Sequence, residues 1–327
     1  MHEDPDNPVR GFHLNTLAST LTTWQEVVEK FLTANDQMKK GNVELMKVWT
    51  NTEMGQTWEE DGETIEDDEL MKRREKYKCE VPEEVLYLTA GVDTQDDRFE
   101  IEVVGWGPEY ESWGIRYAAI YGDNSDINNQ VWQDLDTFLL QTFEKPDGTK
   151  MKLSCVCIDS GGHRTNQVYK FCKARFNRRV FAIKGSNDSA AAYIQKPSKS
   201  NREGAYLFTL GVDTGKSLLM DRLKLEEEGP GFCHFPKEEG KGYDNKYFKG
   251  LTSEKKVMRY KMGRPYFAWE LKDKGEHKRN EALDCRNYAT AAIEITNVPL
   301  KKPDKKKEAT AAKKIVKRGR RRSGGIL

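Results

Sequence analysis

Apolar and polar positions change their period along this chain of 327 residues. In the stretch TTWQEVVEKFLTAN, apolar side chains recur at helical spacing from Trp24 to Leu32, and Thr22 or Thr23 can cap the helix. From about Val85 the period becomes two, as in VLYLTAGVD and RFEIEVVGWG, which indicates strands. The pattern therefore predicts helical pieces at the start of the chain, followed by a domain that contains a sheet.

The later elements follow in an order that favours one fold class. VLYLTAGVD, RFEIEVVGWG and ESWGIRYAAIYG read as three strands of an antiparallel meander. Helix, strand, helix and strand then follow in NNQVWQDLDTFLLQTF, KLSCVCIDSGG, RTNQVYKFCKARF and RRVFAIKG. A further strand, AYLFTLGV, leads into the helix DTGKSLLMDRLKL, and RNEALDCRNYATAAIEI reads as the last helix. We expect an α/β protein with a mixed sheet flanked by helices.

Composition and the pattern of apolar positions divide the chain into three segments: 1–83, 84–297 and 298–327. The last segment is strongly basic, because residues 301–322 hold twelve Lys or Arg against Asp304 and Glu308. The net charge of +1 for the whole chain therefore leaves the rest acidic. A basic tail without aromatic residues is typical of a disordered arm for a polyanion or an acidic partner, or of a solubilising segment.

The chain shows no sign of a membrane segment. No apolar run approaches the roughly 20 residues that span a bilayer, and the amino terminus MHEDPDNPVR is unlike a signal peptide. We therefore expect a cytoplasmic protein.

Carboxylates stand where a metal site on strand ends would need them. Asp93 ends the first apolar run and Asp159 ends LSCVCID, so both can emerge at one sheet edge if these strands are neighbours. Asp284 lies on the last helix, with Glu281 on roughly the same face. Converging carboxylates bind hard divalent cations such as Mg²⁺ or Mn²⁺. The alternative for each aspartate is an ordinary turn or an exposed helix position.

Cationic side chains follow the same strands. His163 and Arg164 come soon after Asp159 in SGGHR, and Lys184 ends RVFAIKG. Such groups can contact a phosphodiester backbone, or they can be ordinary loop charges.

The segment GVDTGKS imitates a phosphate-binding loop. A Walker loop needs four residues between its first glycine and GK, whereas only three separate Gly211 from Gly215. We expect a helix capped by Asp213 or Thr214, and no ATP site in this chain.

Several ordered blocks together resemble a known family. LTAGVDTQDDRFEIEVVGWG, CIDSGGHRTNQVYKFC, VFAIKG, GVDTGKSLLMDRL, GPGFCHFP and RNEALDCRNYATAA are similar to the carboxy-terminal half of the large terminase subunit, GpA-like, of lambda-like tailed phages. The resemblance implies an RNase H-like nuclease domain over residues 84–297. It also makes residues 1–83 the linker that follows an ATPase half.

The resemblance implies a function as well. The family's nuclease half cuts concatemeric viral DNA with divalent metal, and Asp93, Asp159 and Asp284 match its acidic positions. It implies Mg²⁺ or Mn²⁺, as two ions, for the cofactor and double-stranded DNA for the substrate. Further partners would be the small terminase subunit, the portal or prohead, and a separate ATPase polypeptide if the protein is split. Location would be the bacterial host cytoplasm, with a phage or prophage gene.

Two alternatives stay open at this point. Nothing in the chain resembles the Walker blocks of the ATPase half, so the protein is expected to be a truncated or split terminase. It is then either an active endonuclease or a catalytically inert module that binds DNA or the portal. Because fold and acidic residues do not fix a substrate, another RNase H-like nuclease of the resolvase or transposase type is the second alternative.

Overall fold

A computed structural model describes residues 14–39, 44–56, 65–188, 190–261, 264–272 and 279–301. The chain divides into two compact units, Met1–Asp61 and Gly62–Leu327. The boundary predicted between residues 83 and 84 thus lies inside the second unit. Among the described residues, no helix has the length and apolar character needed to cross a bilayer.

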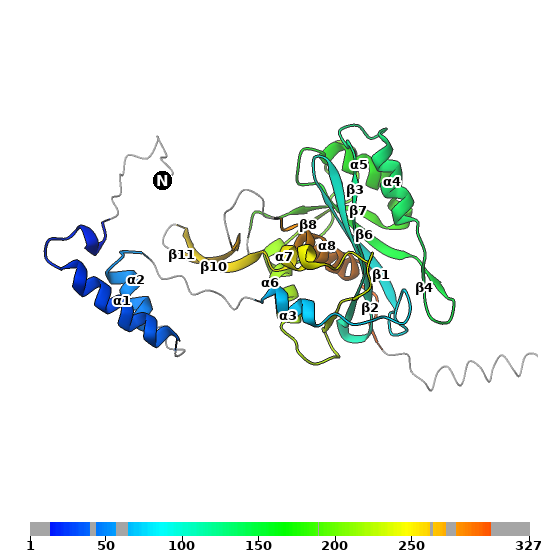
Figure 1. The fold of residues 1–327 in the computed structure, drawn as a ribbon. Coiled ribbons are helices and arrows are strands. Elements are labelled where there is room, and N and C mark those ends of the chain that lie inside the picture. Colours follow the sequence, from blue (N-terminus) through cyan, green and yellow to red (C-terminus); the bar gives the residue numbers. More distant parts are fainter. Residues whose placement is uncertain are drawn as a thin grey trace, which may run out of the picture. The chain divides into compact units, whose positions relative to one another are not determined.

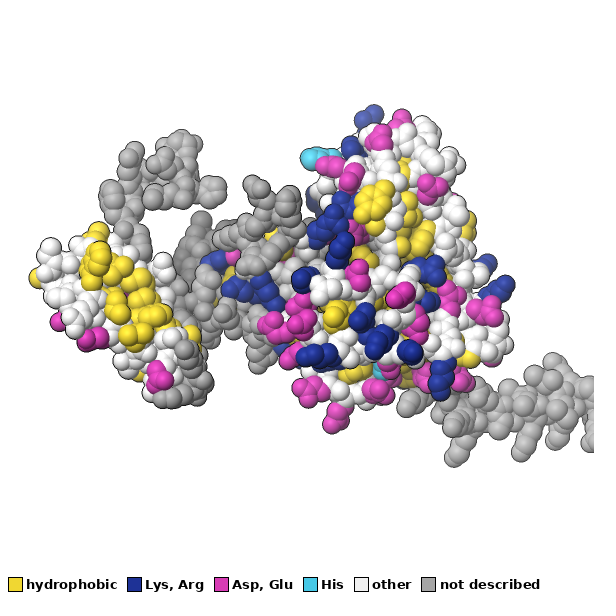
Figure 2. All heavy atoms as spheres, in the orientation of Figure 1, with side chains coloured by type: hydrophobic (Ala, Val, Ile, Leu, Met, Phe, Trp, Pro, Cys, Tyr) yellow, Lys and Arg dark blue, Asp and Glu magenta, His cyan; other side chains and the backbone are white. Residues whose placement is uncertain are grey.

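The first unit is a helical hairpin. It contains a short 3-10 helix, Thr16–Ala18, and two α-helices, α1 (Trp24–Lys39) and α2 (Glu44–Thr52). Thr23 and Glu26 form a capping box, because each side chain accepts a hydrogen bond from the other residue's backbone N–H. This confirms the predicted helix start. Phe31 and Trp49 pack with ring centroids 4.9 Å apart between the two helices. Figure 2 shows many further apolar side chains exposed on this hairpin.

The second unit is built on one large sheet (Figure 1). Its strand order is β8-β7-β6-β1-β2-β3-β9, and two small two-stranded sheets, β10-β11 and β4-β5, accompany it. In the large sheet, β1, β2 and β3 form the predicted antiparallel meander. On the other side of β1, the strands β6, β7 and β8 run parallel to it. The strands are β1 (Tyr87–Thr94), β2 (Arg98–Trp106), β3 (Ser112–Tyr121), β4 (Phe143–Glu144), β5 (Lys150–Met151), β6 (Leu153–Asp159), β7 (Val180–Gly185), β8 (Leu207–Leu210), β9 (Cys233–His234), β10 (Glu254–Lys261) and β11 (Arg264–Leu271).

Helices cover both faces of this sheet. Alternate residues of β1 divide between the faces: Leu88, Ala90 and Val92 join the core formed with α4 and α5, and Thr89 and Gly91 face α8. Figure 1 shows α4 and α5 on one side of the strands and α8 on the other. The RNase H-like expectation, a meander continued by parallel strands with helices on both faces, is confirmed. The helices of this unit are α3 (Asp67–Lys72), α4 (Gln130–Leu139), α5 (Thr165–Ala174), α6 (Val212–Leu223), α7 (Asn245–Leu251) and α8 (Glu281–Thr296), with 3-10 turns at Pro108–Tyr110 and Phe176–Arg178.

Both ends of the second unit extend past the predicted domain limits. Before residue 84, Leu70 of α3 and Val81 are completely buried, and the Glu75 N–H donates to the Phe235 carbonyl at 3.0 Å. After residue 297, Leu300 packs into a small core with Trp106. These contacts attach both segments to the second unit. The basic tail from residue 302 onwards lies outside the described residues.

The GKS segment corrects one prediction. The helix α6 begins at Val212, so Asp213 and Thr214 lie in its first turn and neither caps it. The backbone N–H of Gly211 donates to the carbonyls of Ala192 and Tyr193 at 3.2 and 3.0 Å, and the Thr214 hydroxyl donates to Ala191. A Cβ on Gly211 would lie 2.2 Å from the Ala191 oxygen. The backbone of residues 191–193 thus packs directly against Gly211.

Candidate active site

The two strand aspartates lie side by side at one edge of the sheet. In the parallel pair of β1 and β6, Val92 is level with Ile158, and Asp93 and Asp159 come next on each strand. Thr94 secures this edge, because its hydroxyl donates to the Asp159 carbonyl at 2.9 Å. Since Thr89, Gly91 and Asp93 alternate to the same face, Asp93 points to the side that α8 covers. The same alternation from Cys157 places Asp159 on that side.

Gly91 brings α8 onto this edge. A Cβ at Gly91 would lie 2.0 Å from the Cys285 carbonyl and 2.5 Å from the Ala289 nitrogen. The helix backbone therefore touches the strand backbone, which only glycine permits. The Cys285 thiol also contacts the Glu100 carbonyl of β2 at 3.2 Å. This close crossing carries Asp284, the residue before Cys285, to the two strand aspartates.

The three aspartates influence one another electrostatically. Burial raises the pKa of Asp93 well above its ordinary range, and the charges of Asp284 and Asp159 raise it further. Burial also raises the pKa of Asp159 to about 6, although the Gly161 N–H, which donates to its Oδ1 at 3.1 Å, opposes the change. The pKa of Asp284 is raised by burial, against the attraction of Lys216. Like charges held together in a desolvated place are a common mark of a site that binds cations.

Glu281 is held in place by an arginine. Its Oε1 accepts from Arg98 Nη2 at 2.6 Å, and Arg98 Nε donates to Glu100 at 2.7 Å. All three side chains are at least nine-tenths buried. Glu281 therefore lies close enough to raise the pKa of Asp93 and Asp284, but one of its oxygens already has a cationic partner.

A second cation lies inside the cluster. Lys216 Nζ is 2.8 Å and 2.9 Å from the two carboxylate oxygens of Glu254 and 3.0 Å from Asp284 Oδ1. Asn280 completes this arrangement, because its amide donates to Glu254 at 2.8 Å and to Asp284 Oδ2 at 2.9 Å. Only 6% of Lys216 is exposed. Burial disfavours its charge, yet Asp284 and Glu254 keep its pKa above the ordinary value.

The remaining predicted residues are His163, Arg164 and Lys184. His163 is exposed and its Nδ1 lies 3.3 Å from Asp96. Arg164 donates to Asn124 at 2.8 Å and to the Asp96 carbonyl at 3.4 Å, so it braces the loops around the site. Lys184 is exposed, and its charge acts to lower the pKa of Asp159. Among these three, Lys184 has the clearest electrostatic link to the acidic cluster.

The donor set suits a hard divalent cation. Asp93, Asp159 and Asp284 offer carboxylate oxygens, the ligands that Mg²⁺ and Mn²⁺ prefer. Two of these carboxylates are oriented from outside, because Gln95 donates to Asp93 Oδ2 at 2.5 Å and Gly161 donates to Asp159. Burial, and after it the neighbouring carboxylates, raise the pKa values of these aspartates, and a bound cation would favour their charged forms. The residues present therefore fit a metal centre.

Comparison with known proteins assigns the chain to a family. Residues 9–306 match the family described as terminase large subunit gpA, endonuclease domain. The chain belongs to this terminase endonuclease family. It is 37% identical over 300 residues to the terminase large subunit of Escherichia phage lambda, covering 90% of this chain and 44% of that protein. The terminase large subunit of Enterobacteria phage P21 is 33% identical over 291 residues, covering 87% and 44% respectively. The chain thus spans less than half the length of these relatives.

A solved structure is also similar to this terminase endonuclease chain. It is a mutant nuclease domain of the large terminase subunit gp2 of bacterial virus Sf6, with manganese. The TM-score is 0.43 at 17% sequence identity, with 68% of this chain and 96% of that domain covered.

Three residues in contact with the candidate site of this terminase endonuclease chain are not predicted from the sequence: Lys216, Glu254 and Asn280. Lys216 stood in the GKS segment and was interpreted only as part of a helix start. Glu254 and Asn280 carried no signal, because each is a polar residue in a polar stretch. The unusual burial of Lys216 and Glu254, 6% and 7% exposed, becomes visible only in the folded chain.

Proposed function

We propose that this chain is the metal-dependent endonuclease part of a phage DNA-packaging terminase, which cuts concatemeric viral DNA by hydrolysing phosphodiester bonds. The observation that carries the proposal is the meeting of Asp93, Asp159 and Asp284 at one buried edge of the sheet. Membership of the terminase endonuclease family supports the reaction class.

The metal ligands are proposed to be Asp93, Asp159 and Asp284, with Glu281 as a further candidate. Mg²⁺ or Mn²⁺ bound there, as two ions, would activate a water molecule and stabilise the leaving oxygen. The chain's own residues prepare this site. Gln95 and the Gly161 N–H fix the orientation of the Asp93 and Asp159 carboxylates.

Lys216 has a proposed positioning role in the same site. It holds Asp284 and Glu254 in place by contacts of 3.0 Å and 2.8 Å. It also compensates part of the negative charge before a cation is bound. Lys216 thereby lowers the free-energy cost of burying these carboxylates and leaves all of them in the site.

DNA is the proposed substrate, and three cationic residues are the candidates to meet its backbone. The charge of Lys184 acts to lower the pKa of Asp159. His163 is exposed on the loop that follows Asp159. Arg164 supports that loop. Phosphate groups are bound chiefly by Lys and Arg, so substitution of Lys184 is expected to weaken DNA binding uniformly across sequences.

The wider setting is also part of the proposal. We place the protein in the bacterial host cytoplasm, with the small terminase subunit and the portal or prohead as partners. A separate ATPase half would be a further partner if the protein is split. Membership of the terminase endonuclease family supports this setting.

Plasmid cleavage tests the proposal. Supercoiled plasmid is incubated with the protein and Mg²⁺ or Mn²⁺, and nicked and linear products are measured. The wild type should cut only with metal, and Asp93→Ala should abolish cutting. Asp134→Asn, which changes an exposed carboxylate on α4, is the matched control and should cut like the wild type. Equal cutting by Asp93→Ala, or cutting in EDTA, would overturn the assignment.

The same assay separates the endonuclease from an inert binding module. If neither metal supports cutting, DNA binding is measured against salt for the full chain and for a chain without residues 301–327. Salt-sensitive binding that depends on the tail would then assign the chain to the binding module.

A further inference from the structure

A histidine and several glutamates meet at the end of the sheet away from the catalytic aspartates. His234 lies in β9, paired with Trp113 of β3. Through β2, Trp113 is level with Leu88, five residues before Asp93 on β1. A site around His234 is therefore separate from the proposed catalytic site.

The imidazole of His234 is firmly positioned. It stacks on Trp113 with ring centroids 4.8 Å apart and planes 3° apart, and Phe232 packs edge-on against it at 4.7 Å. Only 6% of His234 is exposed. Both ring nitrogens face carboxylates: Nδ1 lies 2.7 Å from Glu75 Oε1, and Nε2 lies 3.1 Å from Glu111 Oε1.

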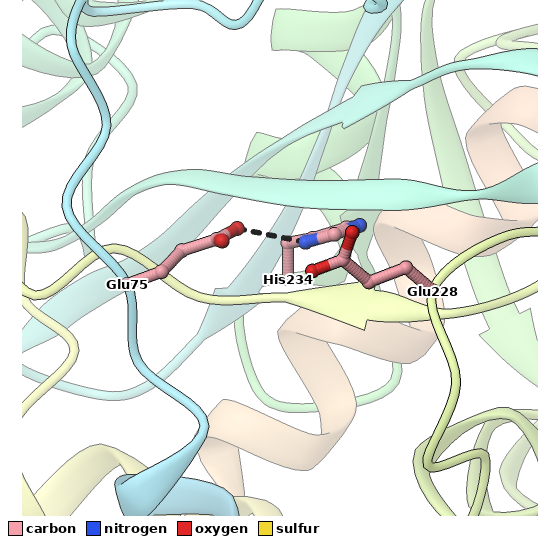
Figure 3. Close-up of side chains that lie close together, drawn as sticks. All are labelled: Glu75, Glu228 and His234. Carbon is pink, nitrogen blue, oxygen red and sulfur yellow. Dashed lines mark hydrogen bonds and ion pairs between the residues drawn. The ribbon is translucent and has the colours of Figure 1, made fainter.

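A third carboxylate reaches the same imidazole. Ligand atoms of Glu75, Glu228 and His234 all lie within 4.8 Å of one another. Figure 3 shows the Glu75 and Glu228 side chains extending toward His234 from opposite directions. They come from the segment after α3 and from the loop before β9, so distant parts of the chain converge here.

The proton count around this ring favours an added cation. A neutral imidazole carries one N–H, so it can donate to only one of its two carboxylate neighbours. An imidazolium could donate to both, but it would offset only one of the three negative charges of Glu75, Glu111 and Glu228. A divalent metal at one nitrogen satisfies the second carboxylate and compensates more charge.

We propose that Glu75, Glu228 and His234 form a second metal site, which takes a divalent transition ion of the Zn²⁺ type. Nδ1 of His234 and one oxygen from each glutamate are the ligands. The Nε2–H donates to Glu111, which fixes the tautomer, as a carboxylate does for many metal-bound histidines. One imidazole with carboxylates is a donor set that zinc accepts, with a further position open to water. The ion ties the segment after α3 and the loop before β9 to the edge of the sheet.

Metal binding by a variant without the catalytic site tests this proposal. The full chain carrying Asp93→Asn and Asp159→Asn is titrated with Zn²⁺ by calorimetry, and bound zinc is counted after dialysis. We expect about one Zn²⁺ per chain. Adding Glu228→Gln should weaken binding at least tenfold, the loss typical for a damaged ligand set. Glu227→Gln, the adjacent exposed glutamate, should leave the affinity unchanged.

His234→Gln supplies a second measurement. It should abolish the zinc-dependent rise in melting temperature that the double variant shows. Because Glu228 is exposed and on a loop, its substitution tests the site even if the His234 variant fails to fold. Absence of zinc binding in the double variant, or unchanged affinity with Glu228→Gln, would overturn the proposal. Neither result depends on DNA cleavage, so the endonuclease proposal stands or falls separately.

Discussion

Neutralising Asp159 should stabilise the metal-free protein, although it removes a residue proposed to hold metal. The folded protein raises the pKa of this carboxyl to about 6, from an ordinary value of 3.8, chiefly through burial. Asn keeps an oxygen that can accept from the Gly161 N–H but never carries the charge. The substitution Asp159→Asn therefore isolates the energetic cost of the charge.

The size of the effect follows from linkage between protonation and folding. A carboxyl whose pKa is raised by folding favours the folded state below its unfolded pKa, and this advantage is lost as pH rises through the folded pKa. Between 3.8 and about 6, at 1.36 kcal/mol per pH unit, the cost reaches about 3 kcal/mol. Asp159→Asn should thus be more stable than wild type by about 3 kcal/mol at pH 8 and by roughly half of that at pH 5.

Urea unfolding in EDTA at the two pH values measures this difference. With a slope of about 3 kcal/mol per molar urea, the midpoint should rise by about 1 M at pH 8. Adding Mn²⁺ should stabilise wild type, by about 2.7 kcal/mol at a concentration 100 times the dissociation constant, and should stabilise the variant much less. Asp134→Asn, an exposed control, should shift stability by less than about 0.5 kcal/mol. A variant that is less stable than wild type at both pH values would refute the reasoning.

Three further substitutions test the framework of the site, each by urea unfolding in EDTA. Gly91→Ala should destabilise by about 3 kcal/mol or more and reduce cleavage, because its Cβ would lie 2.0 Å from the Cys285 carbonyl. Gly162→Ala, with open space around its Cβ, is the control, and equal effects would contradict the close crossing. Lys216→Met should lower the free energy of unfolding by about 3–5 kcal/mol, since it leaves Asp284 and Glu254 without their cation. Adding Mg²⁺ should restore part of this stability. An unchanged free energy of unfolding would contradict the positioning role of Lys216. Arg286→Met should destabilise by a similar amount, because Glu102, 2.7 Å away and fully buried, loses its cationic partner and keeps only hydroxyl donors. Burial raises the Glu102 pKa and Arg286 opposes this, so the variant should regain stability as pH falls, and a pH-independent loss would contradict the argument.

The order of elements was predictable because it depends on local periodicity. Alternation in RFEIEVVGWG and the apolar run before Asp93 predicted strands that the structure confirms. The capped start of α1 was predictable for the same reason, because Thr23 and Glu26 lie only three residues apart in the sequence. Where local rules failed, tertiary contacts explain the failure. Thr214 does not cap α6, because its hydroxyl bonds to Ala191 instead.

By itself, the sequence determined the longer strands of the large sheet and the helices α1, α4, α5, α6 and α8. It also singled out Asp93, Asp159 and Asp284 as candidate metal ligands. Only the tertiary structure decided which polar residues share a desolvated place with them. Lys216 and Glu254 are 38 residues apart and meet at 2.8 Å, while Arg98 reaches Glu281 across 183 positions. These pairs join residues of different elements, α6 with β10 and β2 with α8, and no local pattern encodes them. Burial turns these contacts into strong interactions, because charge is costly wherever water is excluded.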